Sequence, residues 1–239
     1  MKKLIIIAFL FLISTSFTIH NNSLHTKSTL KINYSSNVQK EDIEYYRQEI
    51  KRAFSLLKKQ KKDIDLELNK NEKVQILSIA FPEMLRYDSY SDYLETSSNQ
   101  ILYVKEGKKA SDFSTGYFQM KPSFLEDLEN YVANNESLKQ YNWILIQKKN
   151  EIEVRKERIN RLGNFQWQLR YLKVFWYVAE YKYQSLDFKT KEDKIRFFAT
   201  AYNYGFTKPE KEITKYQVAK KILTGRDLYQ KICLFRFFN

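Results

Sequence analysis

Residues 165–183 of the chain read FQWQLRYLKVFWYVAEYKY, and their apolar side chains recur with the spacing of a helix. The positions that carry this spacing most clearly are Trp167, Tyr171, Phe175 and Val178. Because these residues are three or four positions apart, they share one face of an α-helix. A stripe of large apolar residues usually belongs to a protein core, so we expect this helix to be buried in a mainly α-helical fold.

Glycine and proline are scarce along the whole chain of 239 residues. The sequence contains 5 Gly and 3 Pro, whereas the two residue types together average about 12% in proteins. An all-β protein needs turn residues roughly every 8–12 positions, so this composition argues against that class and favours long helices. Hydrophobic residues make up 43% of the chain, which is enough for a core and argues against wholesale disorder.

Further helices are expected before and after this stretch. Pro82 is expected to break or bend one of them, and Ser91 to cap another. Residues 110–123 are expected to form a loop or a very small hairpin, and the charged residues 148–161 to present a solvated face. The chain after Gly205 also reads as helical. Apolar spacing and capping signals predict helices at 38–60, 71–81, 92–105, 124–133, 148–161, 165–183 and 193–203.

The first 37 residues are expected to lie outside the helical domain. A positively charged start is followed by ten apolar residues, 4–13, and then by small polar ones, which is the pattern of a signal peptide. Ten apolar residues are few for a helix that spans a bilayer. This length favours a signal peptide over the alternative, a permanent membrane anchor. We expect a cleavable signal peptide at 1–16, a flexible tether at 17–37, one domain at 38–239, and export to the periplasm or the medium.

The charge of the chain bears on its partners. Lys and Arg number 41 and Asp and Glu 28, which gives a formal net charge of +13 at pH 7. For an exported protein this charge favours an anionic wall polymer or a membrane surface as a partner and argues against nucleic acid. A single cysteine, Cys233, excludes an internal disulfide framework. His20 and His25 lie outside the periodic segments, so we expect no histidine-based metal site.

Half of the glycines and prolines fall in three short segments. These segments are FPEMLRYD (81–88), STGYFQMKPS (114–123) and ATAYNYG (199–205). In a helix-rich chain, such residues mark places where the backbone must turn against something. Simple punctuation between helices is the alternative, and a shared role requires the fold to bring the three segments together.

The order of these segments resembles the lysozyme-like superfamily, and within it the lytic transglycosylase domain. In that family a helix ends at a catalytic Glu, a loop Gly-Leu-Met-Gln-x-x-Pro-Ser follows, and Ala-Tyr-Asn-x-Gly comes later. Glu83 stands at the place of the catalytic acid, residues 116–123 (GYFQMKPS) match the loop in register, and residues 201–205 (AYNYG) match the last motif. The chain departs from the usual Glu-Ser-x-Phe, because Glu83 is followed by Met84, Leu85 and Arg86. The resemblance implies a lysozyme-like helical domain with a small loop or hairpin lobe.

The resemblance also implies a reaction. Glu83 would cleave the β-1,4 bond between MurNAc and GlcNAc in peptidoglycan strands, first as an acid and then as a base that takes the proton of the muramyl 6-hydroxyl. The N-acetyl group of the sugar would stabilise the developing cation, and the product would be a 1,6-anhydro-muropeptide. No cofactor and no metal are implied. The expected substrate-binding residues are Gln119, which shapes the cleft, Tyr202 near the N-acetyl group, Asn203 as a brace, Ser114 and Gly116.

The residues themselves support an acid at position 83 and leave alternatives open. Cleavage of a glycosidic bond needs a carboxylic acid that is still protonated near neutral pH, which a Glu among apolar neighbours can supply. Glu83 has Phe81, Met84 and Leu85 close in sequence. The alternatives are a hydrolytic lysozyme, a non-catalytic wall-binding protein on the same fold, and a basic helical protein at a membrane surface. A second carboxylate, if one is used, could be Asp88, Asp92, Glu95 or Asp112.

Overall fold

The computed structural model describes residues 47–86 and 89–219, all within the unit Gln39–Asn239. These residues form a mainly helical fold without a strand, as the sequence predicts. Expectations for the signal peptide, the tether, Asp88 and Cys233 lie outside the described residues. The elements in chain order are α3 (Arg47–Lys59), α4 (Lys61–Glu67), α5 (Lys70–Arg86), α6 (Ser89–Glu106), α7 (Pro122–Ala133), the 3-10 helix η1 (Glu136–Ile144), α8 (Glu151–Leu162), α9 (Phe165–Lys182), α10 (Lys191–Tyr204) and α11 (Glu210–Ala219).

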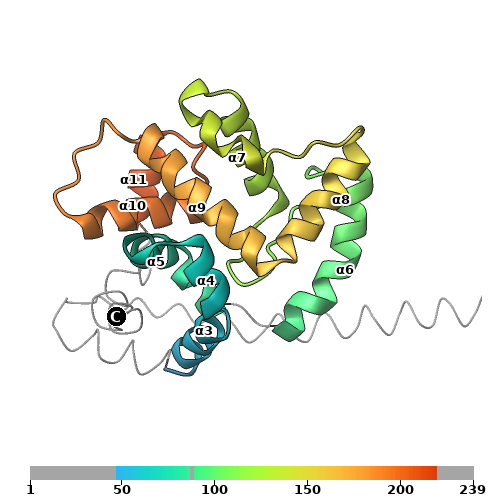
Figure 1. Ribbon diagram of the computed structural model, residues 1–239, viewed down its shortest axis with the longest axis horizontal. Coiled ribbons are helices and arrows are strands. Elements are labelled where there is room, and N and C mark those ends of the chain that lie inside the picture. The colour runs from blue at the N-terminus through green and yellow to red at the C-terminus, as the bar shows by residue number, and fades with distance from the viewer. Residues whose placement is uncertain (1–46, 87–88, 220–239) are drawn as a thin grey trace, which may run out of the picture. The chain divides into compact units, whose positions relative to one another are not determined.

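Helix α9 lies in the core and contacts α4, α5, α7, α8, α10 and η1 (Figure 1). Its start is fixed by Asn164, whose side-chain oxygen accepts a hydrogen bond from the backbone N–H of Trp167, the arrangement that helix N-termini favour. Tyr171, Phe175 and Val178 are fully buried and Trp167 is half-buried. The predicted core stripe is therefore confirmed.

Helix α5 continues through Pro82. Of the two effects expected of this proline, the break is therefore wrong, and the bend stays a prediction. A proline inside a helix lacks the N–H and crowds the preceding turn, which costs about 3 kcal/mol. Burial offsets this cost, because Phe81, Met84 and Leu85 around the proline are all buried in a helix that packs against α3 and α10. As a result Glu83 lies within the last turn of α5 rather than after its end.

Other boundaries agree with the sequence to different degrees. Helix α10 begins after Thr190, whose hydroxyl accepts from the N–H of Asp193, and ends at Gly205, which has a φ of +115°. Helix α6 begins at Ser89, so Ser91 lies inside the helix and the predicted cap is wrong. The short helices α4 and η1 were not predicted. Helix α4 has only seven residues, and η1 is a 3-10 helix with about three residues per turn. Neither shows the apolar spacing of an α-helix clearly.

The loop between α6 and α7 contains the small hairpin that the sequence predicts. Thr115 and Met120 pair through two backbone hydrogen bonds of 2.9 and 3.1 Å, which form an isolated antiparallel bridge. Pro122 then starts α7, where its missing N–H costs nothing. Asp112 accepts hydrogen bonds from the backbone N–H and the hydroxyl of Ser123, so its carboxylate stabilises the start of α7.

Helix α8 is not the solvated helix that its charge predicts, because one face of it is buried. Arg158 forms an ion pair with Glu129 at 2.6 Å and donates a hydrogen bond to the hydroxyl of Tyr103. Arg161 donates to the hydroxyl of Tyr171 at 3.0 Å and lies over the ring of Trp167. Burial of these arginines is tolerable because each is paired with a carboxylate, a hydroxyl or an aromatic face.

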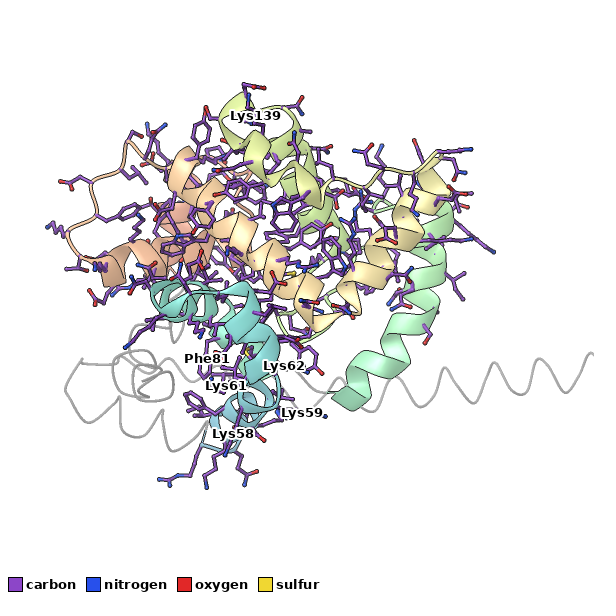
Figure 2. All side chains as sticks on the ribbon, viewed as in Figure 1. Lys58, Lys59, Lys61, Lys62, Phe81 and Lys139 are labelled. Carbon is purple, nitrogen blue, oxygen red and sulfur yellow. The ribbon has the colours of Figure 1, made fainter. Side chains whose placement is uncertain are left out.

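Four lysines lie around the junction of α3 and α4, where Figure 2 shows Lys58, Lys59, Lys61 and Lys62. All four lysines are exposed. The ring of Phe81 lies 5.3 Å from that of Phe54, which ties α5 to α3. In the part of the chain that the structure describes, no helix is long and apolar enough to cross a bilayer.

Candidate active site

The carboxylate of Glu83 lies just beneath the surface, at the end of α5. The residue is only 9% exposed, yet the two side chains bound to its oxygens, Asn203 and Arg86, are both exposed. Glu83 is therefore neither sealed inside the core nor placed on an open surface. This position is compatible with a role in chemistry on a bound ligand.

Asn203 reaches Glu83 from a segment that is 120 residues later in the chain. Its side-chain amide donates a hydrogen bond to Oε1 of Glu83. The contact forms because the last turn of α10 packs against α5. Asn203 was expected to brace the site, and the structure places it in direct contact with the expected acid.

Tyr202, the neighbour of Asn203, joins the same region to the 114–123 segment. Its hydroxyl donates to the backbone carbonyl of Phe118 at 2.7 Å. Its ring packs edge-on against Phe124 at 5.0 Å and Phe175 at 5.4 Å. Burial, together with the nearby charge of Glu83, raises the pKa of Tyr202 well above its usual range. Tyr202 is thus a buried, protonated tyrosine beside Glu83 that also holds the loop.

The turn at Gly116 is shaped by a residue that sequence reasoning missed. Gln168 on α9 is buried, accepts a hydrogen bond from the N–H of Phe118 at 3.1 Å, and donates to the carbonyl of Leu162. A Cβ added at Gly116 would lie 1.7 Å from Nε2 of Gln168. Gly116 therefore makes room for this amide, at a φ of +74° that suits glycine. A lone glutamine on the apolar face of 165–183 was the available signal.

The other two expected substrate-binding residues lie in the same loop. Gln119 has a positive φ of 50°, and its side-chain amide donates to the carbonyl of Gly116 at 3.0 Å, so part of its hydrogen bonding serves the turn. Ser114 is half-buried next to the Thr115–Met120 bridge. The substrate contacts expected of Gln119, Ser114 and Gly116 stay predictions.

Arg86 is a second residue at the site, after Gln168, to which the sequence analysis gave no role. Its Nη1 donates to both carboxylate oxygens of Glu83, at 3.2 and 3.1 Å. The two residues are one helical turn apart on α5, the spacing at which side chains meet. Arg86 occupies the position where the family motif has an aromatic residue, so the sequence did carry a signal in that departure.

Among the candidates for a second carboxylate, Asp112 is the one whose side chain the structure describes. Asp112 is bound to Ser123 and lies 3.7 Å from the ammonium of Lys121, which commits it to the start of α7. Asp88, and the side chains of Asp92 and Glu95, lie outside the described part. Within that part, no three His, Cys, Asp or Glu side chains are grouped to hold a metal ion.

Compared with known proteins, the chain matched no family model, no curated protein and no solved structure. What points to a function is the geometry of the site and the order of the three motifs.

Proposed function

We propose that this protein is an exported peptidoglycan lytic transglycosylase that cleaves the MurNAc–GlcNAc β-1,4 bond with Glu83 as its acid and base. The observation that carries the proposal is the meeting of three motif segments through two long-range hydrogen bonds. Asn203 bonds Glu83, and Tyr202 bonds the carbonyl of Phe118.

The chemistry follows from a single carboxyl group in this setting. Glu83 donates a proton to the glycosidic oxygen as the bond breaks, and the N-acetyl group of the substrate stabilises the cationic carbon. The resulting carboxylate then takes the proton of the muramyl 6-hydroxyl, whose oxygen closes the anhydro ring. Asn203 holds the carboxylate by one oxygen, which keeps it oriented between the two steps.

Burial of Glu83 supports this role, because a carboxyl group that acts on a substrate has to be held in one position beside it. Met84 and Leu85 are buried beside it, and Tyr202 lies against it. An exposed carboxylate such as that of Glu151, whose side chain is 88% exposed, has no such surroundings.

The test is Glu83→Gln assayed on purified peptidoglycan. Glutamine keeps the size of the side chain and can still accept the bond from Asn203, but it cannot donate or take the proton. We expect release of anhydro-muropeptides to fall by about a thousandfold, the usual worth of a positioned acid and base. Products that persist in the variant would remove Glu83 from the mechanism.

Glu72→Gln is the matched control. Glu72 lies on the same helix and is buried, but it is bound to Tyr177 and Lys173 rather than to Asn203. We expect this variant to keep its activity. Binding of peptidoglycan without turnover by the wild type would instead favour the non-catalytic wall-binding protein.

The export part of the proposal rests on residues 1–16 and has its own test. We expect the protein recovered from the producing cells to lie outside the cytoplasm and to begin after the signal peptide. A chain that keeps residues 1–16 would favour the membrane-anchored alternative. The full chain has a net charge of +13, and the cleaved form, without Lys2 and Lys3, has +11. Either charge would draw the protein to anionic wall polymer.

A further inference from the structure

The guanidinium of Arg86 occupies the carboxylate on which the proposed function depends. Both oxygens of Glu83 accept from Nη1 of Arg86, and Oε1 also accepts from Asn203. A glycosidic oxygen needs one of these carboxylate oxygens within hydrogen-bond distance for proton transfer. In this arrangement Oε1 accepts two hydrogen bonds and Oε2 accepts one. A glycosidic oxygen therefore has to share the carboxylate with Arg86 or displace it.

Arg86 is able to move. Its side chain is 54% exposed, while that of Glu83 is 11% exposed. A pair with one solvated partner is held by a modest net energy, since water competes for the guanidinium. A second anion could therefore replace Glu83 as the partner of Arg86 at little cost.

The proposed substrate can supply such an anion. MurNAc carries a lactyl group on the same ring whose glycosidic bond is cleaved, and its carboxyl group is free in strands without stem peptides. Guanidinium groups bind carboxylates with two parallel hydrogen bonds, which a water molecule or a neutral amide cannot reproduce. A strand placed with its glycosidic oxygen at Glu83 brings the MurNAc ring close to Arg86, because Arg86 contacts Glu83.

Resting on the proposed function, we propose that Arg86 selects glycan strands with a free carboxylate on the sugar at the cleavage point, and that binding of this carboxylate frees Glu83. The exchange moves no proton from the guanidinium. Glu83 takes up one proton from the solvent when Arg86 leaves it, gives it to the glycosidic oxygen, and regains one from the 6-hydroxyl. It returns that proton to the solvent when it pairs with Arg86 again. Arg86 is then a specificity residue that also couples substrate binding to the release of the acid.

The experiment compares one set of strands in two forms. Peptide-free glycan strands are used with their lactyl carboxyl groups free, and again after conversion of these groups to neutral amides. We expect kcat/KM of the wild type to be higher on the free-acid strands by about tenfold or more, the worth of one hydrogen bond to a charged group. In Arg86→Gln the ratio should fall to near one, mainly through a higher KM on the free-acid strands, and Arg86→Lys should restore part of it.

Arg52→Gln is the matched control. Arg52 is exposed and donates to the carbonyl of Leu85 at 3.1 Å, so it brings an equal charge to the same end of α5 without contacting Glu83. This variant should keep the wild-type ratio. The proposal is overturned if Arg86→Gln keeps that ratio, if the wild type shows no preference, or if Arg52→Gln loses it as well.

Binding separates a failure of this proposal from a failure of the proposed function. On the Glu83→Gln background, calorimetry with the two strand forms measures the preference without turnover, and the Glu83→Gln, Arg86→Gln double variant should lose it. Absence of cleavage by the wild type would overturn the proposed function alone. Equal binding of both strand forms to the Glu83→Gln protein would overturn the role of Arg86 alone.

Discussion

At the scale of single residues, the site depends on Gly116, whose lack of a side chain leaves room for larger side chains to meet. Gly116 leaves the space that the amide of Gln168 fills, and Gln168 in turn holds the N–H of Phe118. The carbonyl of Phe118 then accepts from Tyr202, whose neighbour Asn203 bonds Glu83. A side chain at position 116 is therefore expected to disturb each of these contacts in turn, as far as the bond between Asn203 and Glu83.

Gly116→Ala tests this series. The new Cβ would overlap Gln168, and a φ of +74° disfavours any residue with a side chain. We expect the free energy of unfolding to fall by about 3 kcal/mol, from overpacking and backbone strain together. Urea unfolding measures it.

Gly163→Ala is the control for the previous substitution. Gly163 has a φ of −76°, and the nearest atoms to an added Cβ are 3.6 Å away. We expect a change within about 1 kcal/mol, and it can be stabilising. Equal losses in the two variants would contradict the account of Gly116.

At the scale of elements, the buried arginine of α8 connects three other helices. Arg158 contacts Glu129 and Glu126 on α7 and Tyr103 on α6, and Glu129 also accepts from Tyr171 on α9. Glu129 is buried, so its charge has to be matched inside the protein. The network therefore fixes how α8 sits against its neighbours.

Arg158→Met should leave Glu129 buried without its cation. Loss of one partner of a buried ion pair costs about 3–5 kcal/mol, and thermal unfolding should show it. Lys139→Met is the control, because Lys139 and Glu136 are 69% and 84% exposed and such pairs contribute less than about 1 kcal/mol. A small loss in Arg158→Met would mean that the pair contributes no more than a surface one.

The elements also show what could be predicted from the sequence. Helices with regular apolar spacing, such as α9 and α10, were predicted correctly. Burial of one helix face requires apolar residues every three or four positions, and this spacing can be read from the sequence. The continuation of α5 through Pro82 was not predicted, since packing of Phe81 and Met84 outweighs the cost of a proline. The buried face of α8 was not predicted either, because arginines every third residue at 155, 158 and 161 resemble a solvated run of charges. Gln168 was missed because its contact with Phe118 spans 50 residues. A glutamine on an apolar face is visible in the sequence, but the partner that it binds is not.

At the scale of the whole molecule, several tyrosines are buried and protonated. Burial is the main cause that raises the pKa of Tyr103, Tyr171 and Tyr202. An unfolded tyrosine loses its proton near pH 10, whereas these three keep theirs at that pH in the folded protein. Their contribution to stability is therefore complete below about pH 10 and is lost as the pH rises further.

The free energy of unfolding should fall steadily above about pH 10, by up to roughly 1.4 kcal/mol per pH unit for each such tyrosine. Tyr202→Phe removes one ionisable group and keeps the ring. We expect its stability to decline less steeply with pH than that of the wild type, as measured by urea unfolding across this range. Parallel declines would show that Tyr202 ionises no later in the folded chain than in the unfolded one.

The central proposal is that one carboxyl group, which Asn203 orients, opens the glycosidic bond without the entry of water. Digestion of peptidoglycan in water enriched in heavy oxygen, followed by mass analysis of the fragments, tests this claim most directly. We predict muropeptides that end in the anhydro ring and carry no label. Fragments with labelled reducing ends, or no fragments at all, would contradict it.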